Sequence, residues 1–391
     1  MSRVVVVGAG AFGLAAAREL VARGLEVVLV ERGRAPHPDA ASTDLSKLVR
    51  GDYGVDVLYT ELMERAWPRW HAANERWHRE LGRELCHETG FLVLSSEPFA
   101  SGGFEHDSFA TLEARGYPLE RLRGEDLARR FPVLARDRFV EGYVNPRAGW
   151  VESGAVVEAE LRALRAEGAR VVEAFALASL ERRGGRVVGV RARDGVLVEG
   201  DAVVLATGAW SSVLAPGLAA RIRPSGHPVV VVRPEGSERF EVPAFLPWAA
   251  DIGRTGWYGF AANADGLVKV ANHGVGLSHD PEAPRVVPKV AVERTRAFLR
   301  GALPELSSAA LATTRLCFYA DSFDGDFLID RHPDEPGLVV ATGDSGHAFK
   351  FYPVLGELVA DALLGAESPY LSRFAWREVG TSRVEQARCR E

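Results

Sequence analysis

The sequence has few cysteines, and they lie far apart. Cys86, Cys317 and Cys389 are the only three among 391 residues, and none belongs to a C-x-x-C pair of the kind found in zinc or redox sites. A disulfide framework is therefore not expected, and the composition suits a reducing compartment. No metal site is predicted.

Long apolar runs and an excess of basic residues are also missing. No uncharged stretch reaches the roughly 18 residues of a membrane helix, and no signal-peptide pattern precedes the first predicted strand. The formal net charge is −6, with basic residues scattered among acidic ones, unlike the basic stripe of a nucleic-acid-binding surface. We therefore expect a soluble cytoplasmic protein that binds neither membranes nor nucleic acid.

What the chain does have is a βαβ pattern at its start. Residues 3–7 (RVVVV) form a β-branched run typical of a strand buried on both faces. The motif G-x-G-x-x-G follows at residues 8–13, and residues 14–23 have helical spacing of apolar side chains. A second buried strand is predicted at residues 25–31. This order of elements is typical of a dinucleotide-binding unit.

The glycines and the terminal acid of this unit each have a separate function. Gly8 permits a tight turn, Gly10 lets a pyrophosphate approach the backbone, and Gly13 allows the helix to pack closely on the strand. The helix N-terminus presents N–H groups and a positive dipole end to phosphates. Glu31 can accept a hydrogen bond from a ribose hydroxyl, and its charge disfavours a 2′-phosphate. This unit alone does not distinguish FAD from NAD.

Two later segments favour FAD. Residues 203–210 (VVLATGAW) predict a buried strand that ends in a turn of small residues, and residues 343–350 (GDSGHAFK) predict a turn that opens a helix. N–H groups of such a turn are suited to face an isoalloxazine carbonyl. Elements of nucleotide-binding type thus occur at the beginning, middle and end of the chain, so the FAD-binding domain is expected to be discontinuous.

The length exceeds the roughly 250–300 residues at which one core stops growing, so two domains are expected. Residues 222–272 alternate in the manner of β-strands with proline and glycine between them, which predicts a mostly antiparallel sheet. We predict an α/β (α+β) fold with a discontinuous Rossmann-like FAD-binding domain and a mostly antiparallel substrate-binding domain. The polar tail after Arg373 is expected to be loosely held. The predicted FAD-binding domain comprises residues 1–90, 148–220 and 318–391, and the substrate domain comprises 91–147 and 221–317.

Several short motifs along the chain are more specific. They are residues 47–54 (KLVRGDYG), 258–260 (YGF), 269–273 (KVANH), 317–319 (CFY) with 324–327 (DGDF), and 345–350 (SGHAFK). With these motifs the chain resembles the D-amino-acid-oxidase-like flavoenzymes. Within them it is similar to the group of monomeric sarcosine oxidase, N-methyltryptophan oxidase, pipecolate oxidase and fructosyl amino acid oxidase. The resemblance covers about residues 3 to 370.

The resemblance implies catalytic roles for three residues. Lys269 matches the oxygen-activating lysine, and Tyr258 and His273 match two side chains of the substrate pocket. A cation near the flavin stabilises the superoxide that forms when oxygen takes the first electron. A buried lysine in a strand is costly without a partner or a purpose; the alternative is a lysine on the outward face of the strand.

The resemblance also implies how substrate and cofactor are held. Arg50 and Lys350 match the pair that binds the substrate carboxylate, and a guanidinium clamps a carboxylate through two hydrogen bonds. Cys317 matches the cysteine that carries the flavin covalently through its 8α carbon. Without the resemblance, the alternative interpretation is that Arg50 is a solvated helix residue and that Cys317 is a small buried apolar residue.

The residues expected to contact FAD come from all parts of the discontinuous domain. His347 is interpreted as a packing or flavin-contact residue rather than a catalyst. The predicted FAD contacts are Gly8, Gly10, Ala11, Phe12, Gly13, Glu31, Arg32, Ser42, Thr43, Lys47, Leu48, Leu177, Thr207, Gly208, Trp210, Cys317, Asp344, Gly346, His347 and Lys350.

The sequence departs from the sarcosine oxidase pattern in places. Thr43 and Lys47 stand where sarcosine oxidases have a histidine and an arginine, and residues 44–47 (DLSK) and Asp344 look more like fructosyl amino acid oxidases. Fungal fructosyl enzymes, however, have a glutamate where this chain has His273, as sarcosine and pipecolate oxidases do. The substituent on the amine nitrogen therefore stays open.

We expect a monomeric FAD-dependent oxidase of secondary amines of amino-acid type, which converts an N-methyl or N-alkyl amino acid, O2 and water into an amine, an aldehyde and H2O2. One alternative is a fructosyl amino acid oxidase, and another is a flavin amine dehydrogenase with an acceptor other than oxygen. A non-catalytic flavoprotein subunit would lack the charged pocket residues Arg50, Lys269 and Lys350, which are present.

Overall fold

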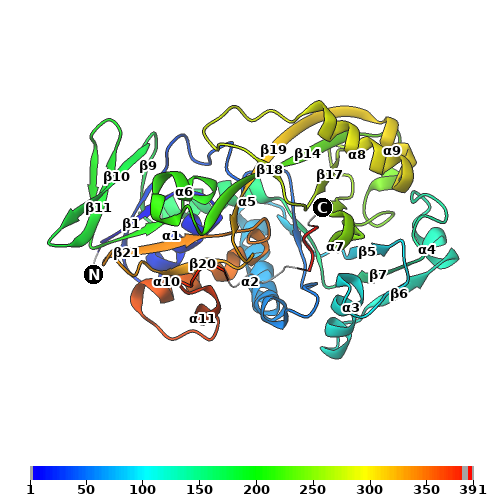
Figure 1. Cartoon of the computed structure of the whole chain (residues 1–391), viewed down its shortest axis with the longest axis horizontal. Coiled ribbons are helices and arrows are strands. Elements are labelled where there is room, and N and C mark those ends of the chain that lie inside the picture. Colours follow the sequence, from blue (N-terminus) through cyan, green and yellow to red (C-terminus); the bar gives the residue numbers. More distant parts are fainter. Residues whose placement is uncertain (1–2, 381–385, 390–391) are drawn as a thin grey trace.

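The computed structural model of the chain describes residues 3–380 and 386–389 and is built around two large β-sheets (Figure 1). A six-stranded sheet takes its strands from the beginning, middle and end of the chain, and a nine-stranded sheet takes most of its strands from the segments between them. In Figure 1 the smaller sheet lies toward the left of the molecule and the strands β5, β6 and β7 of the larger sheet lie at the right.

The six-stranded sheet is parallel except at one edge, where β20 pairs antiparallel with β21. Its central strands consist almost wholly of buried apolar residues, as expected for strands that are covered on both faces. In spatial order its strands are β20 (Leu328–Arg331), β21 (Leu338–Thr342), β13 (Ala202–Leu205), β1 (Arg3–Val7), β2 (Glu26–Val30) and β9 (Arg170–Val172).

The nine-stranded sheet is antiparallel except for the β15–β5 pair. Its longest strands, β14 and β19, pair with each other and run back toward the six-stranded sheet. Its strands are, in order, β18 (Leu277–Ser278), β14 (Ile222–Arg233), β17 (Val268–Asn272), β16 (Trp257–Gly259), β15 (Trp248–Ala250), β5 (Phe91–Ser95), β7 (Glu141–Asn145) and β6 (Glu120–Arg123), with β19 (Ala310–Ser322) beside β14.

Two smaller sheets of three strands complete the β-structure of the described residues. One contains β3 (Lys47–Val49), β8 (Gly149–Val151) and β4 (Cys86–His87), and the other contains β10 (Leu177–Arg183), β11 (Arg186–Ala192) and β12 (Leu197–Glu199). Strand β3 lies against the short helical turn Phe349–Phe351. This contact brings the predicted motif at residues 47–54 next to the one at residues 345–350.

Helices cover one face of the six-stranded sheet, and the β10–β11–β12 sheet packs on its other face. Two helices within residues 289–308 pack on a face of the nine-stranded sheet. None of the helices in the described residues combines the length and apolar character that a membrane span requires. The helices are α1 (Ala11–Ala22), α2 (Val57–Leu81), α3 (Phe104–Ala114), α4 (Glu125–Arg130), α5 (Ser153–Ala166), α6 (Ser211–Leu214), α7 (Ile252–Thr255), α8 (Lys289–Ala302), α9 (Pro304–Ser308), α10 (Tyr352–Leu364) and α11 (Leu371–Phe374).

The long helix α2 connects the core to the candidate site. Its tryptophans Trp67, Trp70 and Trp77 are all buried in one apolar cluster with α1, α5 and α10. The Trp70 indole N–H donates a hydrogen bond of 2.8 Å to the backbone carbonyl of Lys350. Packing of a core helix therefore fixes the backbone that carries one of the predicted substrate-binding cations.

The predicted α/β fold class is confirmed, but the expectation of a loosely held tail is wrong for its described part. Phe374 is fully buried, and Ala387 and Cys389 are also buried. The Arg388 guanidinium forms an ion pair with Asp321 of β19 at 2.6 Å, so a charged residue anchors the chain end. Residues 381–385 and 390–391 of the predicted tail lie outside the described residues.

Candidate functional site

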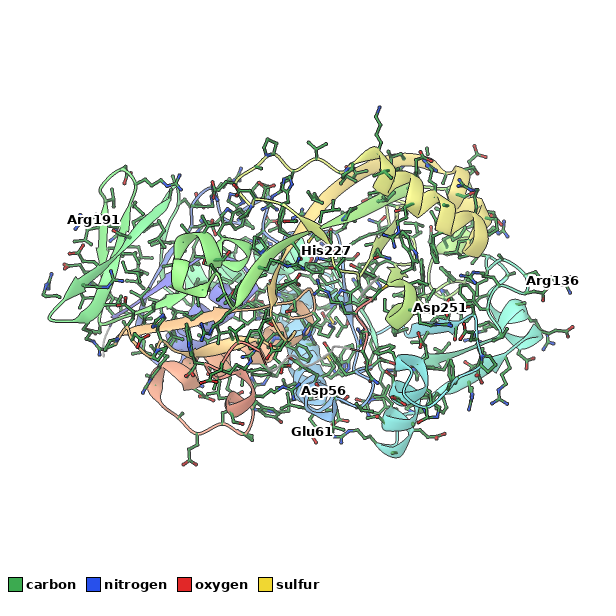
Figure 2. All side chains as sticks on the ribbon, viewed as in Figure 1. Asp56, Glu61, Arg136, Arg191, His227 and Asp251 are labelled. Atoms are coloured by element: carbon green, nitrogen blue, oxygen red, sulfur yellow. The ribbon has the colours of Figure 1, made fainter. Side chains whose placement is uncertain are left out.

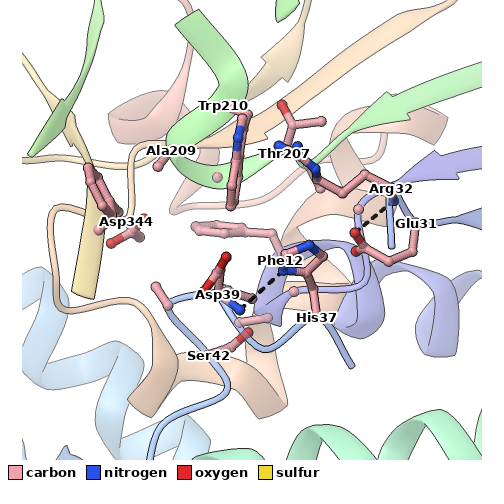
Figure 3. A pocket seen from close by; sticks show the side chains of 18 of the residues that line it. Phe12, Glu31, Arg32, His37, Asp39, Ser42, Thr207, Ala209, Trp210 and Asp344 are labelled. Carbon is pink, nitrogen blue, oxygen red and sulfur yellow. Dashed lines mark hydrogen bonds between the residues drawn. The ribbon is translucent and has the colours of Figure 1, made fainter. Parts of the chain in front are cut away.

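An elongated cavity, here called the cofactor cavity, opens at the carboxyl ends of the parallel strands β1, β2 and β13. Figure 3 shows Glu31 and Arg32 toward one end, Asp344 toward the other, and the rings of Phe12 and Trp210 between them. Ligands of open parallel sheets bind in this position, outside the carboxyl ends of the strands.

The glycine turn between β1 and α1 is packed too tightly for side chains. Gly8 has φ +101°, and a Cβ atom added there would lie 2.4 Å from the carbonyl oxygen of Ala206. A Cβ atom on Gly13 would lie 1.9 Å from the carbonyl oxygen of Gly8. Gly10 is the N-cap of α1, whose first turn carries no acidic residue. The helix N-terminus therefore faces the cavity with its positive dipole end uncompensated, as an anion site requires.

Glu31 is the first residue after β2 and lies at the cavity wall. Its carboxylate accepts hydrogen bonds from the backbone N–H groups of Ala9 at 2.8 Å and Arg32 at 2.7 Å. These two bonds fix the carboxylate beside the glycine turn. A fixed carboxylate here is placed to accept from a ribose hydroxyl.

Unsatisfied polar atoms on the cavity walls indicate that a polar ligand belongs there. Ser42 Oγ and Trp210 Nε1 are buried, yet neither has a hydrogen-bond partner within the described part of the chain. Buried polar atoms are normally hydrogen-bonded, and leaving one unpaired costs about 1–3 kcal/mol. A ribityl, phosphate or isoalloxazine group would supply the missing partners, so the residues fit FAD.

A second cavity, here called the charged pocket, adjoins the first. Lys47, Tyr319, Gly346 and Phe349 line both cavities. The pocket lies between the β3 segment, the nine-stranded sheet and the turn at residues 345–350, so three segments far apart in the sequence form it. The predicted residues that line it are Leu48, Arg50, Tyr258, Lys269, His273, His347 and Lys350.

Two cations mark one end of the charged pocket. The Lys350 ammonium donates hydrogen bonds to the Tyr53 hydroxyl at 3.0 Å and to the His347 carbonyl at 2.9 Å. Arg50 is buried, donates to the Asp52 carbonyl, and has its guanidinium 5.1 Å from the centre of the Tyr53 ring. Tyr53 thus contacts both cations and holds them at the same end of the pocket.

Lys269 reaches the pocket from β17 and is almost completely buried, with 3% of its surface exposed. Its ammonium donates to the Asp44 carboxylate and to the Ser46 carbonyl, both at 2.6 Å. The Lys47 ammonium donates to the same Asp44 oxygen at 3.0 Å. One buried carboxylate therefore holds two lysines, which excludes the alternative of an outward-facing Lys269.

The electrostatics of this cluster are set by burial and by the shared carboxylate. Burial lowers the pKa of Lys269 to about 8, although Asp44 pulls it upward. Burial opposes ionisation of Asp44, but Lys269 and Lys47 outweigh it and hold the pKa of that carboxyl well below its usual range. Lys269 therefore titrates close to neutral pH while Asp44 stays ionised.

Aromatic side chains also line the charged pocket. The Tyr258 and Tyr319 hydroxyls are 3.4 Å apart, and burial raises the pKa of both phenols. His227, near the middle of the molecule in Figure 2, stacks on Tyr319 with ring centroids 3.8 Å apart. Burial places the pKa of His227 well below its usual value, so it packs as a neutral ring.

Cys317 lies in β19 immediately before the cavity-lining residues Phe318 and Tyr319. Its thiol is 1% exposed, and Sγ is 3.8 Å from the Lys47 ammonium. Both other cysteines are also buried, Cys86 in β4 and Cys389 near the chain end.

Comparison with known proteins identifies the family. Residues 3–362 match the family model described as "FAD dependent oxidoreductase". The chain belongs to this family of FAD-dependent oxidoreductases. The predicted family, its dependence on FAD and its classification as an oxidoreductase are thereby confirmed.

Individual proteins match over most of their length. L-saccharopine oxidase of Schizosaccharomyces pombe is 27% identical over 100% of this chain and 96% of that protein. Monomeric sarcosine oxidase of a Bacillus strain is 26% identical over 95% of each. The crystal structure of fructosyl amine:oxygen oxidoreductase (Amadoriase I) from Aspergillus fumigatus superimposes with a TM-score of 0.80 and 25% identity, covering 96% of this chain and 89% of that one.

Most of the residues predicted to contact FAD line one of the two cavities. Leu48, His347 and Lys350 line the charged pocket rather than the cofactor cavity. Those that line the cofactor cavity are Gly8, Gly10, Ala11, Phe12, Glu31, Arg32, Ser42, Lys47, Leu177, Thr207, Gly208, Trp210, Asp344 and Gly346.

Three predicted contacts line neither cavity. Gly13 packs under the glycine turn, and Cys317 lies behind the wall beside Lys47. The Thr43 hydroxyl donates to backbone carbonyls of its own loop, among them that of Ala40 at 2.9 Å. The predicted roles of these residues in cofactor binding stay predictions.

Sequence reasoning missed two residues of the site. The pairing of Asp44 with Lys47 could have been inferred, because an acid three residues before a lysine is within reach of its ammonium. The second partner of Asp44 is Lys269 of β17, and no local sequence pattern indicates that pair. Tyr319 belongs to the motif at residues 317–319, and its alternation with Cys317 along β19 places both side chains on one face.

Removal of the shared carboxylate should destabilise the protein strongly. Asp44→Asn leaves Lys269 and Lys47 buried without their anion, and breaking a buried pair in this way costs about 3–5 kcal/mol. Glu75→Gln, on the exposed face of α2, should change stability by less than about 0.5 kcal/mol. Denaturant unfolding at neutral pH measures both.

The destabilisation caused by Asp44→Asn should depend on pH in a definite direction. Because the Asp44 pKa is depressed in the folded state, its contribution is present above its unfolded pKa of about 3.9 and is lost as pH falls. The stability difference between wild type and Asp44→Asn should therefore shrink below about pH 4. A difference that is small at pH 7, or that grows on acidification, would contradict the role of Asp44.

Proposed function

We propose that this protein is an FAD-dependent oxidase of secondary amines of amino-acid type, with an N-methyl or N-alkyl amino acid as substrate. The observation that carries the proposal is the charged pocket, which adjoins the cofactor cavity and has Arg50 and Lys350 together at one end. A pocket with this charge suits a small substrate with one carboxylate. The products are an amine, an aldehyde and H2O2.

Arg50 and Lys350 bind the substrate carboxylate in this proposal. An arginine offers two parallel N–H donors to a carboxylate and a lysine adds a point charge, so the pair sets the direction of the substrate. With the carboxylate at that end, the amine lies nearer the residues shared by the two cavities. Phe104, Ile252 and Phe260 supply apolar walls for the substituents.

Tyr258 and His273 face the amine. The Tyr258 phenol keeps its proton because burial raises its pKa, so it can donate a hydrogen bond. No general base is needed if the amine loses its proton as it binds. When bound, FAD supplies the hydride acceptor for the amine carbon, and the imine that leaves is hydrolysed by water.

Lys269 is the residue we assign to the reaction with oxygen. It is held by Asp44 and the Ser46 carbonyl beside the boundary of the two cavities. A buried ammonium stabilises negative charge on dioxygen as it is reduced, and it does so most strongly where water is excluded. Asp44 is the positioning residue of this cation.

We further propose that Cys317 carries the flavin covalently, as a thioether between Sγ and the 8α carbon. Its position one residue before Phe318 and its distance of 3.8 Å from Lys47 support this. We also retain as proposals a monomeric, cytoplasmic protein, and the division into a Rossmann-like FAD-binding part (residues 1–90, 148–220 and 318–391) and a substrate-binding part (91–147 and 221–317).

A fructosyl amino acid oxidase is the second candidate. Two residues are more typical of that group: Asp44, which is buried against the Lys269 ammonium, and Asp344, which lines the cofactor cavity. A dehydrogenase that passes electrons to an acceptor other than oxygen is the third. His273 in the charged pocket favours the first candidate over the second.

A substrate panel read as H2O2 formation tests the function. Sarcosine, other N-methyl amino acids, pipecolate, L-saccharopine and fructosyl-valine are compared side by side, with an N-methyl amine that lacks a carboxylate as the control. We expect turnover of at least one N-methyl or N-alkyl amino acid, and little turnover of the control because Arg50 and Lys350 have nothing to bind. Activity on fructosyl-valine alone would instead establish the second candidate.

Replacement of Lys269 tests the oxygen step without any amine. The flavin is reduced with dithionite and mixed with O2 in a stopped-flow instrument. The wild-type rate constant should fall as pH rises through about 8, since Lys269 is charged below that pH and neutral above it. Lys269→Met should lower the rate at pH 7 by about 100-fold and remove the pH dependence.

Lys289→Met, at the exposed start of α8, is the matched control and should behave as wild type. If Lys269→Met is reoxidised as fast as wild type, the assignment of Lys269 is wrong.

Acid precipitation tests the covalent bond. The flavin should stay in the protein pellet of wild type and appear in the supernatant of Cys317→Ser, because only a covalent link survives unfolding. Cys86→Ser, another buried thiol, should retain the flavin in the pellet. Release of the flavin from wild type would refute attachment at Cys317.

A further inference from the structure

A loop from the nine-stranded-sheet side contacts residues that line the cofactor cavity. It comprises residues 279–288, between β18 and α8, and is called the strap here. In Figure 1 the chain between these two elements extends toward the six-stranded sheet. Its shape is fixed locally, since the backbone N–H of Ala283 donates to the Asp280 carbonyl at 3.0 Å and three prolines restrict its backbone.

The strap is fastened to the end of β2. The Glu282 carboxylate accepts two hydrogen bonds from the Arg32 guanidinium, at 2.6 and 3.1 Å. Arg32 directly follows Glu31, the carboxylate assigned to the ribose, and both line the cofactor cavity. An element of the substrate side is thereby tied to the nucleotide-binding end of the cavity.

A second attachment uses Arg285. Its guanidinium lies 5.0 Å from the centre of the Trp210 ring and 4.4 Å from that of Phe318, both of which line the cavity. The Arg32 guanidinium lies 4.9 Å from the centre of the same Trp210 ring. Arg285 also donates to the backbone carbonyl of Asp39, on the loop that forms the cavity wall.

The charge of Arg285 is incompletely satisfied. Its Nη2 atom is buried and has no hydrogen-bond partner among the described residues. Burial lowers the pKa of this guanidinium, and Asp39 offsets that only in part. Arg315 of β19 also has one buried nitrogen, Nε, without a partner among the described residues, but both of its terminal nitrogens donate, to the Thr43 and Ala40 carbonyls at 2.7 Å each. Arg285 is partly buried beside the residues of a cavity that takes a dinucleotide, and Asp39 satisfies its charge only in part. FAD carries two phosphates that could complete it.

We propose that Arg285 is a cofactor-positioning residue that meets the negative charge of the FAD diphosphate, and that the Arg32–Glu282 pair fastens the strap that carries it. The substrate side of the molecule then takes part in cofactor retention. The proposal depends on FAD binding and not on the identity of the amine.

The test measures FAD affinity directly. In a Cys317→Ser background, in which no thioether can form, the dissociation constant of FAD is measured by quenching of flavin fluorescence. Arg285→Met keeps the apolar stem over Trp210 but removes the charge, and should weaken FAD binding about tenfold to a hundredfold, the range for hydrogen bonds to a charged group. Arg285→Lys keeps the charge, and its FAD dissociation constant should lie between those of wild type and Arg285→Met.

The matched control removes a charge from the same side of the molecule. Arg300→Met, on the exposed face of α8, should leave the FAD affinity unchanged. The affinity of wild type should also fall more steeply with salt than that of Arg285→Met, because a charge–charge contact is screened. Glu282→Gln should weaken binding less than Arg285→Met, since the Arg32–Glu282 pair is partly exposed.

A structural role would give a different pattern. Melting of the cofactor-free proteins shows whether Arg285→Met is destabilised independently of FAD. An unchanged FAD dissociation constant in Arg285→Met, with or without a lower melting temperature, overturns the proposal. So does an equal loss of affinity in Arg300→Met.

Discussion

The buried carboxylate of Asp44 is the constraint on which the site depends. It joins Lys47 of β3 to Lys269 of β17, two elements that belong to different sheets. None of the three charges would be stable in this position alone, since burial of an unpaired charge is expensive. Their mutual satisfaction fixes where β3 meets the nine-stranded sheet, and with it the position of Arg50 just after β3.

This arrangement explains why the two cavities adjoin. Lys47 and Tyr319 line both, one held by Asp44 and the other stacked on His227. A flavin at this boundary would have the charged pocket and its carboxylate-binding end on one side and the Lys269 cluster close by. In the proposed function, different residues of this one pocket would serve substrate binding and oxygen activation, and both would lie beside the same cofactor.

Charged side chains also join the two large sheets at the nucleotide-binding end of the cofactor cavity, where the strap lies. Residues of the larger sheet and its loops hold the cavity wall through Arg315 and Arg285, which bind backbone carbonyls of residues 39–43. Guanidinium groups suit this task because their several N–H donors reach more than one carbonyl. The larger sheet thus helps to shape the cofactor cavity as well as the charged pocket.

The parts of the fold and site that could be predicted from the sequence are those whose residues lie close together along the chain. The strand at residues 3–7, the glycine turn and Glu31 lie in one continuous unit, and Lys269 and His273 in one short motif. The partner of Lys269 is Asp44, 225 positions away in the sequence, and no periodicity indicates such a pairing. The strap has neither helical nor strand spacing, and the packed chain end at Arg388 depends on Asp321 of β19. Long-range ion pairs were therefore the part that sequence patterns could not supply.

The central claim is that the charged pocket delivers an amine to a flavin at its boundary. Anaerobic mixing of the yellow protein with N-methyl and N-alkyl amino acids tests it most directly. The flavin absorbance should bleach with at least one of them and return when air is admitted. A flavin that dithionite bleaches but that no N-substituted amino acid reduces would contradict the account.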